Sequence, residues 1–128
     1  MGRETETYDT EFPDLAFVYL EDSWVLAIES GTGTLRFAIE AVLSPGHPSY
    51  SPPGVSEQHC YRRAVLSLHA EELAFEPSRL PPATDSTGTP DYGNIDTFDQ
   101  TEPGHWRLNG DWGTATAHRP EVHLTLDP

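Results

Sequence analysis

Six histidines and one cysteine are the residues of this 128-residue chain that could ligate a metal or form a catalytic pair. His59 and Cys60 are adjacent, so on an extended strand their side chains point to opposite faces and cannot chelate one ion together. His118 and His123 flank a turn before the last strand and could meet across it, but a zinc site needs further ligands. Cys60 could act as a thiolate nucleophile beside His59 or His69, yet it begins an apolar strand face, where a buried free cysteine is ordinary packing. We therefore predict no metal site, no cofactor and no catalytic residue.

Pairs of carboxylates are the second group of residues that could be catalytic, because two opposed acids can perform the general acid and base steps of glycoside hydrolysis. The candidates are the pairs Glu21 with Asp22, Glu71 with Glu72, and Asp96 with Asp99, together with Asp111. Since the chain has 21 acidic residues, such pairs also arise by chance. No glycine-rich phosphate loop and no basic aromatic stripe occurs, which argues against nucleotide and nucleic-acid binding. The sequence thus favours a protein that is not an enzyme, and a carboxylate-based hydrolase is the third choice.

The stretch from residue 91 to 112 interleaves acidic and aromatic side chains. Aromatic residues supply binding energy at an interface, and charge of one sign speeds association with a partner of the opposite sign. Arg107 is the arginine that opposes these acids. We favour a place in the core for Phe98 and Trp106, whereas Tyr92 and Trp112 suit the core and a surface equally well. The predicted partner-binding residues are Asp91, Tyr92, Asp96, Asp99, Glu102, Asp111 and Trp112.

The net charge of −14 arises from 21 acids against 7 arginines, with no lysine. Such a charge favours a basic protein partner and disfavours nucleic acid and anionic membranes. A generally acidic proteome, in a salt-tolerant or high-GC organism, is a second explanation. No apolar run approaches the roughly 18 residues of a membrane span, and the acidic N-terminus is unlike a signal peptide. One cysteine fits a reducing compartment, so we expect a cytoplasmic monomer or homodimer.

Short β-strands must position these residues. Two alternating runs flank the glycine-rich residues 30–33 and predict a β-hairpin between residues 19 and 43. On its first strand the alternation predicts one face made of Trp24, Leu26 and Ile28, after a bend or bulge at residues 21–23. On its second strand it predicts a face made of Leu35, Phe37, Ile39, Ala41 and Leu43.

Later segments repeat this pattern. Residues 60–69 alternate again, and Asn109 with Gly110 gives the strongest two-residue hairpin signal of the chain. Residues 44–54 hold four prolines and two glycines and predict a long exposed loop. We predict an all-β antiparallel fold, a sandwich or partly open barrel of about 7–8 short strands. A single β domain would span residues 12–128, after a disordered acidic tail of residues 1–11.

Six segments carry a resemblance to a known type of protein: EDSWVLAIE, LRFAIEAVL, HCYRRAVLSL, DYGNIDTF, LNGDWGTATA and VHLTL. Together they span residues 13–127, and the chain resembles small bacterial all-β proteins of uncharacterised families, some similar to immunity proteins of polymorphic toxin systems. The resemblance implies a cytoplasmic inhibitor that binds a cognate toxin, and it carries over no site residue, because what is shared is a pattern of turns and strands.

A nuclease toxin is often basic because it binds phosphates, so an acidic inhibitor would suit it. We therefore expect a non-catalytic acidic binding protein, in its most specific form an immunity-type inhibitor of a basic toxin. The alternative is a β domain that binds a small ligand or carbohydrate, with residues 44–54 as a lid over tryptophan and tyrosine side chains.

Overall fold

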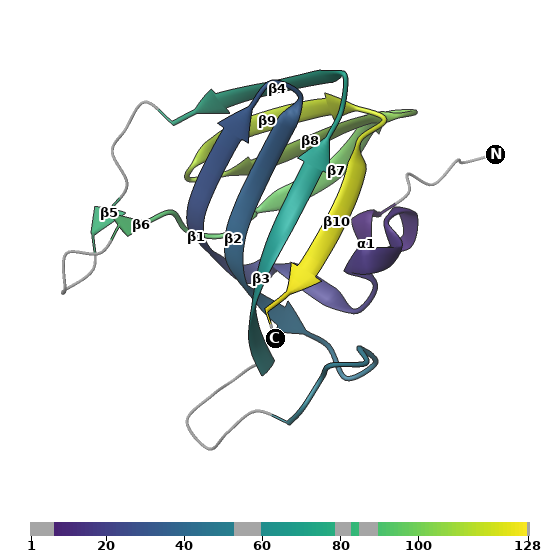
Figure 1. The fold of residues 1–128 in the computed structure, drawn as a ribbon, viewed down its shortest axis with the longest axis vertical. Helices are drawn as coiled ribbons and strands as arrows, with labels where there is room; N and C mark the ends of the chain where they lie inside the picture. The colour runs from purple at the N-terminus through teal and green to yellow at the C-terminus, as the bar shows by residue number, and fades with distance from the viewer. Residues whose placement is uncertain (1–6, 53–59, 79–82, 85–89, 128) are drawn as a thin grey trace.

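The computed structural model describes residues 7–52, 60–78, 83–84 and 90–127. Its strands are β1 (Val18–Gly31), β2 (Thr34–Leu43), β3 (Cys60–His69), β4 (Glu72–Pro77), β5 (Ala83–Thr84), β6 (Pro90–Asp91), β7 (Thr97–Glu102), β8 (His105–Gly110), β9 (Gly113–His118) and β10 (Glu121–Leu126). Two four-stranded antiparallel sheets face each other, one in the order β1-β2-β3-β10 and the other in the order β4-β9-β8-β7 (Figure 1). The predicted antiparallel all-β fold is confirmed as a sandwich, and the described strands do not close into a barrel.

The hairpin of β1 and β2 forms as predicted. Gly31 pairs with Thr34, so Thr32 and Gly33 make the turn. Gly33 has a φ of +69°, a conformation that glycine adopts without steric cost. The predicted apolar face of β2 is buried at every position from Leu35 to Leu43. β3 pairs with β2 along its whole length and buries its own alternate residues in the same core.

The predicted face of β1 is wrong, because the strand is irregular at two places. Its pairing with β2 shifts between Tyr19 and Trp24 and again between Val25 and Ala27. Because a shift of one residue moves a side chain to the other face, Val25 is buried whereas Trp24 is exposed on the outer face. Buried and exposed residues alternate from Val18 to Leu20 and again from Ser23 to Leu26, but the two runs are out of step with each other.

The second predicted hairpin forms, but its turn lies two residues further on. Gly110 pairs with Gly113, so Asp111 and Trp112 occupy the turn in place of Asn109 and Gly110. A Cβ on Gly110 would lie 2.4 Å from the backbone oxygen of Asn94. The glycine here therefore permits close approach of a neighbouring chain segment instead of forming the turn.

The N-terminal residues cover one end of the sandwich. They form a short helix, α1 (Tyr8–Glu11), and a 3₁₀ turn, η1 (Pro13–Leu15), and Figure 1 shows α1 beside the sheets. Tyr8 stacks on Phe98 with ring centroids 5.6 Å apart, and Phe12 stacks on the same ring at 5.6 Å. Residues 8–11 thus belong to the fold, which corrects the predicted tail in this part. Residues 1–6 of that tail lie outside the described residues.

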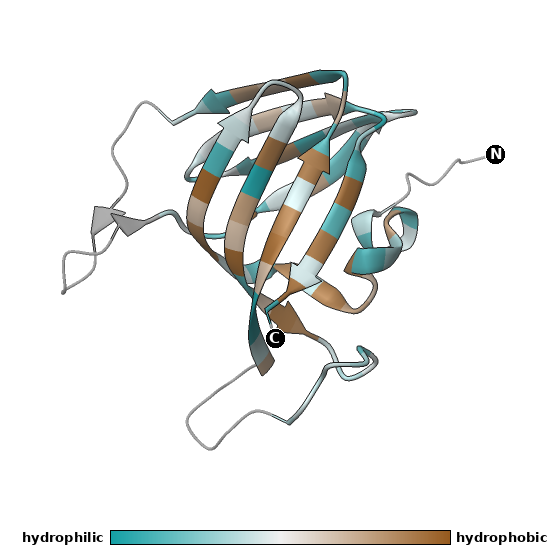
Figure 2. Ribbon diagram, in the orientation of Figure 1, coloured by the Kyte–Doolittle hydropathy of each residue, from teal (hydrophilic) through white to brown (hydrophobic). Residues whose placement is uncertain are grey.

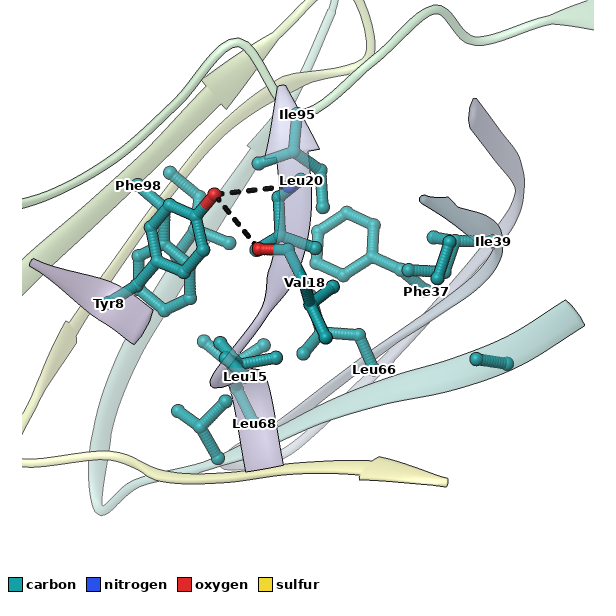
Figure 3. Close-up of a cluster of buried hydrophobic side chains, with 14 of the residues drawn as sticks. Tyr8, Leu15, Val18, Leu20, Phe37, Ile39, Leu66, Leu68, Ile95 and Phe98 are labelled. Atoms are coloured by element: carbon teal, nitrogen blue, oxygen red, sulfur yellow. Dashed lines mark hydrogen bonds between the residues drawn. The ribbon is translucent and has the colours of Figure 1, made fainter. Parts of the chain in front are cut away.

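The hydrophobic core lies between the two sheets and under α1. Hydrophobic bands cross β1, β2 and β3 in Figure 2, and Figure 3 shows part of the core. Ile95 and Phe98, predicted as anchors of their segment, are 1% and 2% exposed. The largest fully buried side chains are Phe37, Leu15, Leu20, Leu35, Ile39, Leu43, Leu66, Leu68, Ile95, Leu108 and Ser23.

Candidate functional site

Four large hydrophobic side chains stand exposed in ten consecutive residues that include most of β1. Their exposed fractions are 55% for Phe17, 49% for Tyr19, 42% for Trp24 and 40% for Leu26. No other large hydrophobic side chain of the described residues is exposed to this degree. Since soluble proteins seldom gather apolar side chains on their surface without a binding role, these four residues define the candidate site. We call them the β1 apolar surface.

The irregularity in β1 brings the two aromatic rings of this surface close together. Tyr19 pairs with Val42 and Trp24 pairs with Glu40, and only Ala41 separates these partners on β2. Residues 20–23 of β1 therefore span an interval that a single residue spans on β2. Since positions two apart on one strand share a face of the sheet, Tyr19 and Trp24 occupy neighbouring outer positions.

Ser23 holds the irregularity in place. Its side chain is fully buried, its Oγ accepts a hydrogen bond from the backbone N–H of Val42 at 2.9 Å, and its hydroxyl donates to the backbone oxygen of Tyr19 at 2.8 Å. The serine hydroxyl thus replaces backbone groups that would pair in a regular ladder. Asn94 donates from Nδ2 to the Ser23 backbone oxygen at 2.8 Å, so the bulge is fixed from the neighbouring segment as well.

The segment around Asn94 ties the edge of β1 to the opposite sheet. The backbone N–H of Val25 donates to the Gly93 oxygen at 2.8 Å. The Asn94 backbone oxygen accepts from Nε1 of Trp112 at 3.1 Å. Trp112 in turn lies edge-on against Phe37, with ring centroids 4.8 Å apart. The position of the β1 apolar surface therefore depends on a tryptophan buried between the sheets.

A groove of about 520 Å³ adjoins Phe17 and Tyr19. Its walls come from α1, from the start of β1 and from β7, and three of its lining residues are carboxylates: Asp9, Glu21 and Asp99. No arginine or histidine is among the described residues that line it. We call this the acidic groove. Carboxylates beside exposed aromatic rings suit a guanidinium or ammonium group, which the carboxylates bind as ion pairs and the rings bind through cation–π contacts.

Tyr8 fixes one of these carboxylates. Its hydroxyl donates to Oε1 of Glu21 at 2.5 Å and accepts from the backbone N–H of Leu20 at 3.0 Å. The hydroxyl oxygen also lies 3.4 Å from the Val18 oxygen, and Figure 3 shows the bonds to Leu20 and Val18. Burial first, and then the hydrogen bond to Glu21, raise the pKa of Tyr8 above its ordinary value of 10.0. Tyr8 therefore stays protonated and holds Glu21 at the groove.

Phe17 forms a ridge between the acidic groove and a second hollow. Its backbone φ is +61°, a left-handed conformation that costs a residue with a side chain about 1–2 kcal/mol. Its backbone oxygen accepts from the N–H of Ser44 at 2.8 Å. A Cβ on Gly46 would lie 2.6 Å from the Phe17 ring, so this glycine lets the ring rest on the loop. Backbone strain of this kind is often found at binding sites.

The second hollow, of about 420 Å³, lies between Phe17 and the loop after β2. Residues 44–52 of the predicted loop contain no strand, and His47 and Asp14 are the polar side chains that line the hollow. Burial, and then the nearby Arg62 charge, lower the pKa of His47. Arg62 donates to the backbone oxygens of Ser49 and Asp127 at 3.5 and 3.4 Å.

The predicted aromatic residues of the partner-binding stretch are not the exposed ones. Trp112 is 4% exposed, which corrects its predicted place at an interface. Tyr92 is half-buried and packs against the core. Phe98 and Trp106 are buried, as favoured from the sequence.

The predicted acidic residues of the same stretch do not meet at one place. Asp99 lines the acidic groove. Asp96 and Asp111 are exposed, and a Cβ on Gly93 would lie 3.0 Å from an Asp111 carboxylate oxygen. Glu102 lies on the far sheet with Oε2 3.9 Å from Nε2 of His105. Asp91 is in β6, and its side chain lies outside the described residues.

The histidine and cysteine candidates lie apart from one another. His118 stacks on His105, whereas His123 has Nδ1 3.4 Å from Oδ2 of Asp14, so the suggested meeting of His118 and His123 is wrong. Cys60 is buried, with Sγ 3.5 Å from the backbone N–H of Ser51. Across the described part of the chain, no three or more histidine, cysteine or acidic side chains are already arranged around one point as metal ligands. His59 lies outside the described residues.

The β1 apolar surface was not predicted from the sequence, although the sequence contains a signal for it. Residues 21–23, two acids and a serine, interrupt the apolar pattern of the first strand and predict a bulge. A bulge changes the face on which later side chains fall, so Trp24 and Leu26 could have been assigned to the surface from that point. Nothing in the sequence indicated that Asp9 and Asp99 would meet Glu21 at one groove.

No protein-family model matches the chain, and comparisons with curated proteins and with solved structures give no significant match. Among the described residues, no helix has the length and apolar character needed to cross a membrane.

Proposed function

We propose that this chain is a non-catalytic acidic binding protein that captures a basic protein partner with the β1 apolar surface and the adjoining acidic groove. One observation carries the proposal: the most exposed large hydrophobic side chains of the described residues lie on β1 or directly before it, beside a groove lined by three carboxylates. Aromatic anchors surrounded by charge of one sign are typical of interfaces that bind an oppositely charged partner.

The apolar part of this surface is large enough to matter for affinity. Full burial of a large hydrophobic side chain contributes about 1.5–3 kcal/mol. Each of the four side chains is 40–55% exposed, so about half of that value remains for a partner to gain. The four together offer about 3–6 kcal/mol, which corresponds to a factor of about 10²–10⁴ in affinity.

The net charge of −14 adds speed and selectivity. A basic partner is steered toward an acidic surface, and its association slows as salt screens the charges. An immunity-type inhibitor of a basic toxin, acting in the cytoplasm, is the most specific form of this proposal. It agrees with the resemblance of the sequence segments to small bacterial immunity proteins.

Affinity capture from the host lysate with matched variants tests the proposal. Trp24→Ala and the pair Asp9→Lys with Asp99→Lys alter the proposed surface. Glu71→Lys with Glu121→Lys makes the same charge change at exposed residues that line neither the acidic groove nor the β1 apolar surface. We expect the first two proteins to lose a basic partner that the parent and the control retain.

The captured protein is then purified and its association followed by stopped flow at low and high salt. The lysine pair in the acidic groove should slow association at least tenfold at low salt and much less at high salt. Equal association rates for the groove variant and the control would refute the groove as the site. Equal capture by Trp24→Ala would refute the role of the β1 apolar surface.

A small-ligand or carbohydrate-binding domain is the second candidate, and the hollow beside Phe17 favours it. Phe17, Pro13 and Leu124 give this hollow aromatic and apolar walls, and His47 and Asp14 offer polar contacts. A thermal-shift screen of saccharides and small aromatic compounds tests it. A ligand that raises the melting temperature of the parent but not of Phe17→Ala would favour this candidate over the protein partner.

A further inference from the structure

A row of four potential metal ligands crosses the sheet opposite the β1 apolar surface. His105 on β8 pairs with His118 on β9. On the outer sides of these strands, His118 pairs with Glu72 of β4, and His105 pairs with Glu102 of β7. Because directly paired residues of an antiparallel sheet share a face, all four side chains lie on one face. Trp106 is buried on β8 next to His105, so this face is the outer one.

The two imidazole rings lie face to face. Their centroids are 4.3 Å apart and their planes differ by 11°. A tetrahedral ion bound at about 2.0–2.1 Å by two nitrogens holds them about 3.3 Å apart. Since the lone pair of an imidazole nitrogen lies in the plane of the ring, the stacked rings must turn about their ring torsions until both planes contain the ion, and these terminal torsions are broad. The backbone pairing of His105 and His118 need not change.

We propose that His105 and His118 form a two-histidine chelate for a borderline divalent cation of the zinc and copper class. Imidazole is a preferred ligand of these ions. Glu102, whose Oε2 lies 3.9 Å from Nε2 of His105, supplies a carboxylate beside the pair. Water completes the coordination, since no three such side chains of the described residues already converge on one point.

The surroundings leave room for an ion and supply negative charge. A shallow hollow of about 360 Å³ opens over the pair, and Glu71 and Glu72 are among its lining residues. Two arginines are near: Arg119, whose Cγ and Nε lie 3.2 and 3.4 Å from the place of a Cβ on Gly104, and Arg107, which follows His105 by two residues on the same face of β8. Glu71, Glu72 and Glu102 outnumber them, so the local field favours a divalent cation.

This site is separate from the proposed partner site, because none of its proposed ligands belongs to the β1 apolar surface or lines the acidic groove. A bound ion would join β8 and β9 close to the end where β7 turns into β8. Since an ion that binds only the folded chain stabilises it by mass action, the expected consequence is a metal-dependent gain in stability. A loss of partner binding would leave this property intact.

Copper and zinc titrations of the untagged protein test the inference. We expect one tight Cu²⁺ per chain, with an electron paramagnetic resonance spectrum that shows two nitrogen ligands. Zn²⁺ should raise the melting temperature. His105→Gln and His118→Gln should each weaken Cu²⁺ binding at least tenfold, and Glu102→Gln should weaken it less.

His69→Gln and His123→Gln are the matched controls, since these histidines lie on the other sheet, and they should bind Cu²⁺ like the parent. The electron paramagnetic resonance spectrum of the parent protein alone gives the number of nitrogen ligands, so this result does not depend on whether the variants fold. One nitrogen ligand in the parent, or parental affinity in both His105→Gln and His118→Gln, would overturn the inference.

Discussion

Replacing Ser23 by alanine should destabilise this protein far more than a serine on a strand usually does. Ser23 is fully buried, and its hydroxyl accepts from the Val42 N–H and donates to the Tyr19 oxygen. Alanine removes both partners without filling new space. A buried polar group left without a partner costs about 1–3 kcal/mol, so two such groups, one of them partly solvated, cost about 2–4 kcal/mol.

Urea unfolding followed by circular dichroism measures this loss. A domain of this size has a total stability of about 5–15 kcal/mol, so Ser23→Ala should lower the midpoint by about 1–2 M urea with an unchanged slope. Ser30→Ala is the matched control, because Ser30 lies on the same strand and is exposed. We expect its midpoint to equal that of the parent.

The same variant links the bulge to the proposed function. Ser23 sets the offset that places Tyr19 and Trp24 at neighbouring outer positions, so its loss should also weaken partner binding under conditions where the variant stays folded. A loss of stability below about 0.5 kcal/mol would mean that the Val42 N–H finds another partner. The hydroxyl would then not be what holds the bulge, and this reasoning would fail.

Three further predictions concern single residues of the core and the surface. Because the pKa of Tyr8 is raised in the folded state, the contribution of this tyrosine to stability is present below pH 10 and falls by about 1.4 kcal/mol for each pH unit above it. The difference in unfolding free energy between the parent and Tyr8→Phe should therefore become smaller between about pH 9 and about pH 11. A difference that stays constant over this range would contradict the prediction. Trp24 is 42% exposed, while the other two tryptophans are 2% and 4% exposed. The Trp24→Phe variant should therefore lose most of the quenching of tryptophan fluorescence by neutral acrylamide, and its emission should shift to shorter wavelength. An unchanged quenching constant would place Trp24 in the core. Gly113→Ala should lower the free energy of unfolding in urea by about 2–4 kcal/mol, because φ is +137° at this residue and a Cβ would lie 2.2 Å from the Glu76 backbone oxygen. A decrease of less than about 1 kcal/mol would show that β4 moves aside freely.

Alternation predicted the regular strands well and the irregular one badly. On β2 each inward position from Leu35 to Leu43 is apolar, and the structure buries them all. The same reasoning failed on β1, because two shifts in the pairing change which side chains face inward: Trp24 and Leu26 are exposed, whereas Ile28 packs against the core. The acids and serine at residues 21–23 marked the place of the bulge. The number of residues that it absorbs depends on Ser23 and Asn94, which lie 71 positions apart in the chain.

The position of the turn between β8 and β9 was also predicted from local sequence preference, and tertiary contacts changed it. Asn109 and Gly110 are favourable hairpin residues, yet the turn moves to Asp111 and Trp112. Trp112 is held there by its bond to the Asn94 oxygen and by its contact with Phe37. A single sequence shows the preference of a dipeptide for a turn, but not the core contact that outweighs it.

The candidate site could not be found from composition for a related reason. Tyr92 and Trp112 lie within an acidic stretch, so the sequence pointed to them, but both pack inward. Asp99 belongs to the acidic groove only because α1 folds back on β7, where Thr7 makes an isolated bridge with Asp99. A charged groove assembled from three separate segments leaves no motif in any one of them.

An edge strand that exposes aromatic side chains is a hazard, since its free edge can pair with another copy. The edge of β1 is shielded near Trp24, where the backbone pairs with Gly93 and Asn94. The bulge interrupts the strand next to this point, and a net charge of −14 makes two copies repel each other. These features oppose self-pairing but leave the outer face of β1 open. They do not oppose a basic partner, which the same charge attracts, so the exposed rings are better explained by a partner of opposite charge than by a homodimer.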